Sequence, residues 1–317
     1  MIDITVAIPT YNGAEKIPKV FEKLQQQTGL ENVNWEIIVI DNNSSDDTSK
    51  VVKEYQDINF LPVELKYYFE SQQGASSARQ RAVKEAKGEL IAFLDDDNLP
   101  EINWLAEAVI FAQKHPKAGA YNGKIFGKYE TNPPDNFQVI ENHLAIRDRG
   151  KKAILFEPDK LRLPPSAGLV VRKKSWLESV PQKTKFTGII GNLRGSGEDY
   201  EILLYLDKAG WEIWYNPSQK IEHYIPASRL EKQYLLTLAM SNGLAICQLR
   251  MINAEFWQIP IIFLKTFFGN LRRVVIQYLK YKKQLKTNLT AEFELTFYWG
   301  SVLSCFYWIR QEFNLIS

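Results

Sequence analysis

The chain has 317 residues, 45% hydrophobic and 24% charged, a composition that excludes disordered and collagen-like proteins. This length allows one large domain with an appendage, or two domains. The formal net charge is +2, but residues 254–317 carry eight Lys or Arg against four Asp or Glu, which leaves residues 1–253 at −2. The basic excess therefore belongs to the C-terminal segment.

The cysteines and the N-terminal residues indicate a cytoplasmic protein. Cys247 and Cys305 lie in apolar stretches, and a disulfide scaffold needs more than two cysteines, so both are expected to be reduced core thiols. Asp3 stands near the start, and no apolar stretch of about 10 residues follows it, which argues against a signal peptide.

Strands and helices alternate through the first hundred residues. Short apolar runs predict strands over 4–8, 35–40, 63–68 and 90–94. Helical spacing predicts helices over 14–27 and 74–87, and between them a helix that begins after the possible N-caps 42–45 and ends at Tyr55. This order is typical of parallel βαβ units and a doubly wound α/β sheet. No G-x-G-x-x-G follows the first strand and no G-x-x-x-x-G-K-[ST] occurs, so dehydrogenase-type dinucleotide binding and a P-loop are unsupported.

Three consecutive acids, Asp95, Asp96 and Asp97, follow the fourth predicted strand. Carboxylates held together repel one another unless a positive charge lies between them. A hard divalent cation would supply that charge, and Mg²⁺ in proteins binds one or two carboxylates together with substrate phosphates. Open α/β sheets bind ligands at strand ends, which favours a metal site over the alternative of an acidic turn that caps the next helix.

The first and second strands also end on residues suited to a nucleotide. Thr10 to Asn12 follow the first strand, and Asp41 follows the second. A carboxylate just beyond a strand can bind a ribose hydroxyl or a base N–H. For Asp41, an equally open interpretation is an acid that caps the following helix.

The second half of the chain is less regular. Two proline pairs in residues 121–165 predict long loops over a mixed sheet, and 166–171 reads as a short strand. Glu198 and Asp199 precede a helix over 202–209, where acids also stabilise a helix dipole, so a purely structural role stays open. His223 is a candidate ligand, although a single histidine is more often a packed residue.

The last segment, 254–317, combines two aromatic belts with a basic section. Neither apolar run reaches the ~18–20 uninterrupted residues of a spanning helix. Aromatic and basic residues at this density suit helices that lie in a membrane interface. The alternative is a helical subdomain that packs on the core or on another subunit.

Five stretches of this chain, taken together, resemble the motifs of family 2 glycosyltransferases in order and spacing. They are Val6–Asn12, Ile38–Asp46, Gly74–Arg79, Gly88–Asp97, which resembles the D-x-D strand, and Gly197–Glu201, which resembles the downstream E-D motif. The resemblance covers about residues 1–225. It implies a GT-A fold, which is a Rossmann-like mixed α/β sheet flanked by helices, and a nucleotide-diphosphate-sugar donor, with UDP favoured.

The resemblance also implies roles for individual residues. The expected nucleotide-sugar contacts are Pro9, Thr10, Tyr11, Asn12, Asp41, Gly74, Arg79, Asp95 and Asp96. The expected ligands of a divalent cation, Mg²⁺ or Mn²⁺, are Asp97, Asp95 and His223. Asp199 matches the catalytic base, with Glu198 as the alternate, and Asp96 is the acid of the triplet expected to be replaceable.

The implied division is a catalytic domain over 1–225, with a nucleotide-binding half (1–115) and an acceptor-binding half (116–225). A helical region over 226–317 would lie peripherally on the inner face of the plasma membrane. Processive relatives carry a Q-x-x-R-W motif and several spanning helices after the E-D motif. Residues 226–236 lack that motif and the tail shows no spanning segment, so transfer of one sugar is expected.

The sequence therefore predicts a metal-dependent, inverting glycosyltransferase. Its acceptor would be a hydroxyl of a saccharide or a lipid-linked molecule in polysaccharide or glycoconjugate biosynthesis. One alternative is sugar transfer to polyprenyl phosphate, for which Arg172, Lys173 and Lys174 would bind the acceptor. Another is a non-catalytic GT-A binding or scaffolding protein. An oligomer remains open, and nucleic-acid binding is not expected because the basic residues lie among aromatics without a recognised module.

Overall fold

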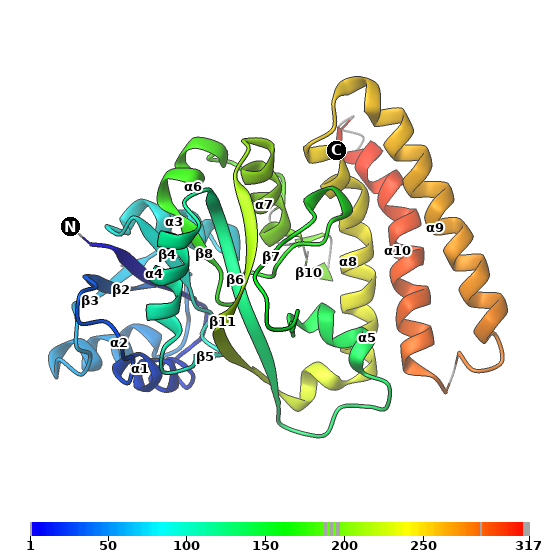
Figure 1. Ribbon diagram of the computed structural model, residues 1–317. Coiled ribbons are helices and arrows are strands. Elements are labelled where there is room, and N and C mark those ends of the chain that lie inside the picture. The colour runs from blue at the N-terminus through cyan, green and yellow to red at the C-terminus, as the bar shows by residue number, and fades with distance from the viewer. Residues whose placement is uncertain (1, 187–188, 191–192, 195–196, 286, 313–317) are drawn as a thin grey trace.

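The computed structural model describes residues 2–186, 189–190, 193–194, 197–285 and 287–312 (Figure 1). Its strands are β1 Ile4–Thr10, β2 Trp35–Asp41, β3 Leu65–Phe69, β4 Leu90–Phe93, β5 Asn98–Pro100, β6 Ala118–Tyr129, β7 Ile154–Leu155, β8 Val170–Arg172, β9 Ile189–Ile190, β10 Leu193–Arg194 and β11 Glu212–Ile225. Its α-helices are α1 Ile17–Gln25, α2 Thr48–Asp57, α3 Ala75–Glu85, α4 Trp104–Lys114, α5 Gln138–Glu141, α6 Lys173–Ser179, α7 Glu198–Lys208, α8 Lys232–Ile252, α9 Ile259–Tyr281 and α10 Leu289–Glu312. The 3₁₀ segments are η1 Asn142–Leu144, η2 Pro158–Lys160, η3 Ala227–Leu230 and η4 Phe256–Gln258.

One central sheet organises the molecule, in the order β3-β2-β1-β4-β8-β6-β11-β5, with β7 paired to β11. The first four strands are parallel, and β1 and β2 are buried along nearly their whole length. Strands covered on both faces read as continuous apolar runs, which is why the sequence revealed them. The predicted α/β fold is confirmed, although β1 extends through Pro9 and Thr10 instead of turning there.

The second half of the sheet is mixed, because β8 runs antiparallel to both β4 and β6. The prediction of long loops over 121–165 is wrong where β6 continues to Tyr129 and pairs with β11. Three glycines, Gly119, Gly123 and Gly127, interrupt the apolar pattern of β6, and glycine is depleted in strands. The hydrophobic pattern of the sequence therefore did not predict β6.

Helices cover both faces of the sheet (Figure 1). One buried cluster joins the sheet to α1, α2 and α4, and a second joins it to α3, α6, α7 and α8. Ala245 and Leu249 of α8 belong to this second cluster. The first C-terminal helix is thus packed on the core of the sheet domain.

The C-terminal helices α8, α9 and α10 lie side by side at one end of the molecule (Figure 1). A Cβ at Gly243 of α8 would come 2.5 Å from the Phe297 carbonyl oxygen and 2.9 Å from Gly300 Cα, so only glycine permits this close approach to α10. Cys247 and Cys305 are buried and free, as predicted for reduced core thiols.

Among the described residues, α8 alone is long and apolar enough to cross a membrane, judged by length and composition. This helix precedes residues 254–317, the segment whose apolar runs were expected to be too short to span. More than half of its most apolar stretch is buried inside the molecule, as in the core helix of a soluble protein.

Candidate active site

A cavity of about 430 Å³, here called the catalytic cleft, lies at the carboxyl ends of β1 and β4. It is within the size range of small-molecule sites. Nine of the predicted site residues line it: Pro9, Thr10, Tyr11, Arg79, Asp95, Asp96, Asp97, Asp199 and His223. The acidic triplet does not cap a helix, because β5 follows it and α4 begins only at Trp104.

Asp199, in the first turn of α7, is held by two neighbours. Arg79 Nη1 of α3 donates to Asp199 Oδ1 at 2.7 Å, and the Ser166 backbone N–H donates to Oδ2 at 3.1 Å. Arg79 Nη2 also donates to Ser166 Oγ at 2.6 Å, which closes a ring of three residues. The Arg79 side chain is buried, so this carboxylate has a fixed orientation toward the cleft.

Asp95 carries the repulsion expected of the triplet. Burial raises its pKa to about 6, with further increases from the charges of Asp97, Asp199 and Asp96. Arg79 opposes this increase from 3.5 Å away. The cleft therefore holds more negative charge than its own cations neutralise, which is the condition under which a bound cation is stabilised.

Asp96, the acid of the triplet predicted to be replaceable, accepts hydrogen bonds from two neighbouring side chains. Thr10 Oγ1 donates to Asp96 Oδ2 at 2.7 Å, and Lys16 Nζ donates to Oδ1 at 3.1 Å. Burial raises the pKa of Asp96, while Lys16 and Thr10 oppose that rise. Asp96 thus ties the end of β1 to the end of β4.

Asp97 faces β11 and η3. Its Oδ2 lies 3.5 Å from His223 Nε2 and 3.1 Å from Arg229 Nη2, and Asn98 Nδ2 donates to its Oδ1 at 3.0 Å. Burial disfavours its charge, but His223, Arg229 and Lys16 outweigh burial and hold the pKa at about 2. Asp97 is therefore ionised throughout the physiological range.

The three predicted metal ligands reach one cleft but do not form one ligand set. Among the described residues, no group of three His, Cys, Asp or Glu side chains is gathered so that it could hold an ion. Asp95 faces Arg79, whereas Asp97 and His223 face each other. Arg229 Nη1 also lies 3.2 Å from His223 Nε2, so its guanidinium contacts both donor atoms.

Three predicted site residues do not line the cleft: Asp41, Asn12 and Gly74. Asp41 is buried, and both of its carboxylate oxygens are engaged, by the Ser44 backbone N–H at 2.9 Å and the Tyr67 hydroxyl at 2.6 Å. The Asn12 side chain accepts from the Ser45 backbone N–H at 2.9 Å. The Gly74 backbone N–H donates to Asn42, which does line the cleft. Their contacts instead organise the loops that follow β1, β2 and β3.

Glu198 also lies outside the cleft lining, next to Asp199. Its Oε2 accepts from the Ser76 backbone N–H at 3.0 Å, at the start of α3. Burial raises the pKa of Glu198 to about 7, with a further increase from Asp199 and an opposing effect of Arg79. The pKa of Glu198 would suit a base near neutral pH, but Glu198 does not line the cleft, whereas Asp199 does. Because geometry takes precedence over pKa in choosing a base, Asp199 is the better candidate.

Sequence reasoning missed Lys16, Ser166 and Arg229, each of which contacts an acid of the cleft. Lys16 offered a signal, because it closely follows the Val6–Asn12 motif. Nothing in the local pattern distinguished Ser166 or Arg229.

The basic residues expected to bind a polyprenyl phosphate lie elsewhere. Arg172 donates to the Ala112 and Ala118 carbonyl oxygens, and Lys173 donates to that of Ala86. Lys174 is exposed and does not line the cleft. That expectation is wrong in its choice of residues.

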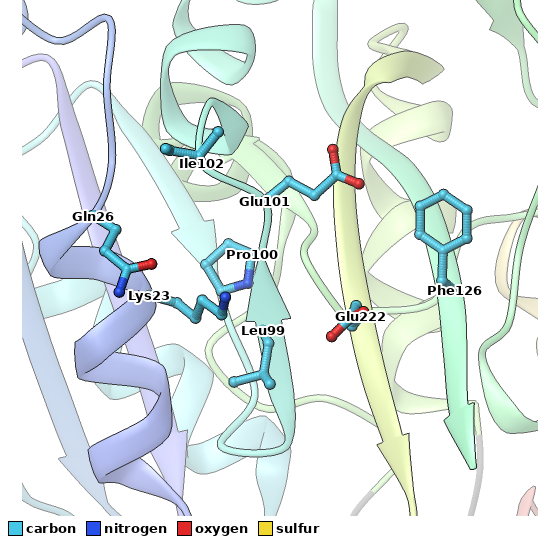
Figure 2. A pocket seen from close by; sticks show the side chains of 8 residues that line it. All are labelled: Lys23, Gln26, Leu99, Pro100, Glu101, Ile102, Phe126 and Glu222. Atoms are coloured by element: carbon cyan, nitrogen blue, oxygen red, sulfur yellow. The ribbon is translucent and has the colours of Figure 1, made fainter.

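Another cavity lies between α1, β5, β6 and β11 (Figure 2). Figure 2 shows Lys23 of α1 and Gln26, the residue after this helix, facing Pro100 and Leu99 of β5, with Glu222 and Phe126 on the other side. None of the predicted site residues lines it.

The matched region and the fold agree on the class of protein. Residues 5–174 match the profile described as Glycosyl transferase family 2, and the chain belongs to this family. It resembles the putative teichuronic acid biosynthesis glycosyltransferase TuaG of Bacillus subtilis, with 26% identity over 152 residues, 48% of this chain and 58% of TuaG. It also resembles the UDP-Glc:alpha-D-GlcNAc-diphosphoundecaprenol beta-1,3-glucosyltransferase WfgD of Escherichia coli, with 31% identity over 180 residues, 55% of this chain and 66% of WfgD.

The similarity to these relatives thus spans between about half and two thirds of their lengths. Among solved structures, the mannosyltransferase PcManGT from Pyrobaculum calidifontis, in complex with GDP-Man and Mn²⁺, has a TM-score of 0.59. Its sequence is 16% identical, and the superposition covers 96% of this chain and 87% of that one. The GT-A fold predicted from the motifs is confirmed by this likeness.

Proposed function

We propose that the catalytic cleft transfers one sugar from a nucleotide-diphosphate sugar to a hydroxyl of a saccharide or lipid-linked acceptor, with inversion at the anomeric carbon. One observation carries the proposal: Asp199 is fixed by Arg79 and Ser166 in the same cleft as Asp95 and Asp97. A positioned carboxylate and a cation-attracting acidic group are the two components that this reaction requires.

The reaction needs a single displacement. The acceptor oxygen attacks the anomeric carbon while Asp199 accepts the hydroxyl proton, and the bond from that carbon to the diphosphate oxygen breaks. The nucleoside diphosphate leaves with the bonding electron pair. Attack from the face opposite the leaving group inverts the anomeric centre, and no covalent intermediate on the protein is required.

The ligand atoms offered by Asp97 and His223 suit a divalent cation. An ionised carboxylate oxygen and an imidazole nitrogen, Asp97 Oδ2 and His223 Nε2, lie 3.5 Å apart, and Mn²⁺ accepts both ligand types. Diphosphate oxygens of the donor would complete the coordination. When bound, the cation would neutralise the charge that develops on the departing diphosphate. Since Arg229 now contacts both donor atoms, cation binding requires its guanidinium to move aside.

The donor is expected at the β1 side of the cleft, where Pro9, Thr10 and Tyr11 line the wall. Tyr11 is 44% exposed, so its ring is available to stack on a base. WfgD is named for UDP-Glc, which supports UDP for this chain. We propose residues 1–225 as the catalytic domain, 1–115 for the donor and 116–225 for the acceptor.

We also propose that residues 226–317 attach the protein peripherally to the inner face of the plasma membrane. η4 and α9 expose large apolar side chains: Phe256, Trp257, Ile261, Leu264, Phe268, Val275, Ile276, Tyr278 and Leu279. Basic residues alternate with them in the sequence, which suits binding to anionic lipid. In Figure 1, α9 is the outermost of the C-terminal helices, away from the sheet.

Asp199→Asn is the test of this function. The amide keeps the shape and cannot accept the proton, so transfer should fall about 10²–10⁴-fold, the usual contribution of a general base. UDP affinity measured by calorimetry should stay within about twofold. Glu198→Gln is the matched control and should retain most activity. Transfer that is unchanged in Asp199→Asn would contradict the base assignment, and UDP binding without transfer by the wild-type protein would favour a scaffolding role.

A further inference from the structure

A second cavity, here called the helix-walled cavity, adjoins the catalytic cleft at Asp199. Its volume is about 340 Å³, and it shares Asp199, Ala145 and Pro165 with the cleft. Because one carboxylate borders both spaces, a molecule in this cavity can present a hydroxyl to Asp199 while a donor occupies the cleft.

The C-terminal helices build one wall of this cavity. Asn242, Ala245, Ile246 and Leu249 of α8 line it together with Phe297 of α10. The opposite wall comes from the sheet domain: Asn142, His143, Arg147, Leu161, Gly197 and Tyr200.

The position of α8 against Asp199 depends on Gly197, which precedes α7 with φ +117°. A Cβ at this position would lie 2.9 Å from the Phe186 ring and 3.3 Å from Ala245 Cβ. Only glycine adopts this conformation readily and leaves this space. The start of α7, with Asp199, is therefore seated directly against α8.

The polar groups of the cavity favour an anionic, hydroxyl-bearing ligand. Arg147 Nη1 donates to Asn142 Oδ1 at 2.6 Å, while its buried Nε has no hydrogen-bond partner among the residues that the structure describes. His143 Nδ1 lies 2.8 Å from Asn242 Nδ2 and accepts from it, which leaves Nε2 as a donor. Burial, with a further decrease from Arg147, lowers the His143 pKa to about 4, so this ring is neutral.

The apolar groups favour a ligand that also carries a hydrocarbon portion. Ile246, Leu249 and Phe297 contribute an apolar face on the side of the C-terminal helices, opposite the Arg147 side. A free oligosaccharide would leave much of this apolar face exposed to water, whereas the hydrocarbon chain of a lipid-linked saccharide would cover it.

We propose that the helix-walled cavity binds the acceptor, and that this acceptor is a saccharide joined through phosphate or diphosphate to a lipid. Its sugar hydroxyl lies at Asp199, its phosphate at Arg147, and the start of its hydrocarbon chain along α8 and α10. This proposal rests on the proposed glycosyltransferase function and deepens it, because it makes the C-terminal helices part of the acceptor site.

The probe is the decyl diphosphate ester of N-acetylglucosamine, titrated calorimetrically into the full chain with saturating UDP and Mn²⁺, so that the donor site is filled. Arg147→Gln and Ile246→Trp should each weaken its binding about tenfold or more, since tenfold is about 1.4 kcal/mol, the scale of one charge-assisted contact. The matched controls, Arg149→Gln and Leu244→Trp, lie on the same segments outside the cavity lining and should bind as the wild type does. UDP affinity reports on folding in all four variants.

Three further probes separate the components of the ligand. N-acetylglucosamine 1-phosphate lacks the chain, decyl phosphate lacks the sugar, and decyl β-glucoside lacks the phosphate; each should bind more weakly than the ester. Arg147→Gln should affect the phosphate-bearing probes and spare the glucoside. Decyl phosphate that binds as tightly as the ester would overturn the saccharide assignment in favour of a polyprenyl phosphate.

Equal ester affinity in the wild type and both cavity variants would overturn the proposal, as would a wild-type protein that binds UDP but no ester. Failure of the wild type to bind UDP would contradict the proposed function alone, because the ester titration still reports on the cavity.

Discussion

Arg229 Nη2 lies 3.1 Å from Asp97 Oδ2, and this contact joins the C-terminal region to the acidic triplet. Arg229 belongs to η3, immediately before α8, whereas Asp97 follows β4 in the sheet. The same guanidinium contacts His223 at 3.2 Å. The Arg229 side chain thus places a positive charge at Asp97 Oδ2 and His223 Nε2, the two atoms that we propose as ligands of a divalent cation.

Arg229→Ala should strengthen Mn²⁺ binding to the protein without donor. Removal of a unit charge about 3 Å from the carboxylate removes a competitor for Asp97, and at an effective dielectric constant of about 20 this is worth up to ~5 kcal/mol. Solvent screening reduces this effect, so the Kd for Mn²⁺ should fall about tenfold. Electron paramagnetic resonance of free Mn²⁺ measures this directly. Arg229→Lys, which keeps the charge, is the control, and weaker binding in the alanine variant would show that Arg229 supports the ion instead.

Thr10→Val tests the link between β1 and the triplet. Valine has nearly the same shape, but it leaves Asp96 Oδ2 without the hydroxyl that donates to it at 2.7 Å. An unsatisfied buried acceptor costs about 1–3 kcal/mol, so the free energy of unfolding in urea should fall by that amount. Thr10→Ser retains the hydroxyl and should lose less. A loss in Thr10→Ser as large as that in Thr10→Val would mean that the hydrogen bond stabilises the fold no more than the methyl group does.

The meeting of the residues that follow β1 and β4 in one cleft could be predicted from the sequence, because parallel strands end at one edge of a sheet. Thr10 and Asp95 are far apart in the chain, yet β1 and β4 pair directly, so their following residues must meet. The acidic residues at the start of α7 could also be recognised in the sequence. Arg79 was predicted only as a contact of the nucleotide sugar, and its hydrogen bond to Asp199 was not foreseen.

The contacts of Ser166 and Arg229 could not be predicted, because they depend on tertiary placement. Ser166 reaches Asp199 only because β8 runs antiparallel beside β4, and glycines concealed the neighbouring strand β6. Arg229 reaches Asp97 because β11 continues to Ile225 and η3 follows it back toward the cleft. The wall formed by α8 depends on helix packing that no local pattern encodes.

The pH dependence of stability tests the environment of Glu198. Its pKa is about 7 in the folded protein and 4.5 ordinarily, so the folded state binds the proton more tightly than the unfolded state. Stability from this group is therefore complete below about pH 4.5 and is lost as the pH rises through 7. Allowing for partial exposure, the loss should be about 1–2 kcal/mol. Thermal unfolding at pH 5 and pH 8 should show a smaller decrease for Glu198→Gln than for the wild type, and equal decreases would exclude this burial effect.

Membrane attachment through the outer face of η4 and α9 can be tested in the full chain with a double variant, Trp257→Ser with Phe268→Ser. These side chains are 67% and 59% exposed, so their removal should leave the fold intact. Burial of each large aromatic in the interface contributes about 1.5–3 kcal/mol, and flotation with vesicles rich in anionic lipid should fall at least about tenfold.

The matched control for that experiment is Ile58→Ser with Leu177→Ser, which removes two residues of similar exposure, 68% and 63%, from the sheet domain. It should float as the wild type does. If the two double variants float equally, the apolar face of α9 is not the attachment surface, and a second protein subunit becomes the better candidate to cover it. High salt should weaken flotation of the wild type, because the basic residues of α9 act through screened charges.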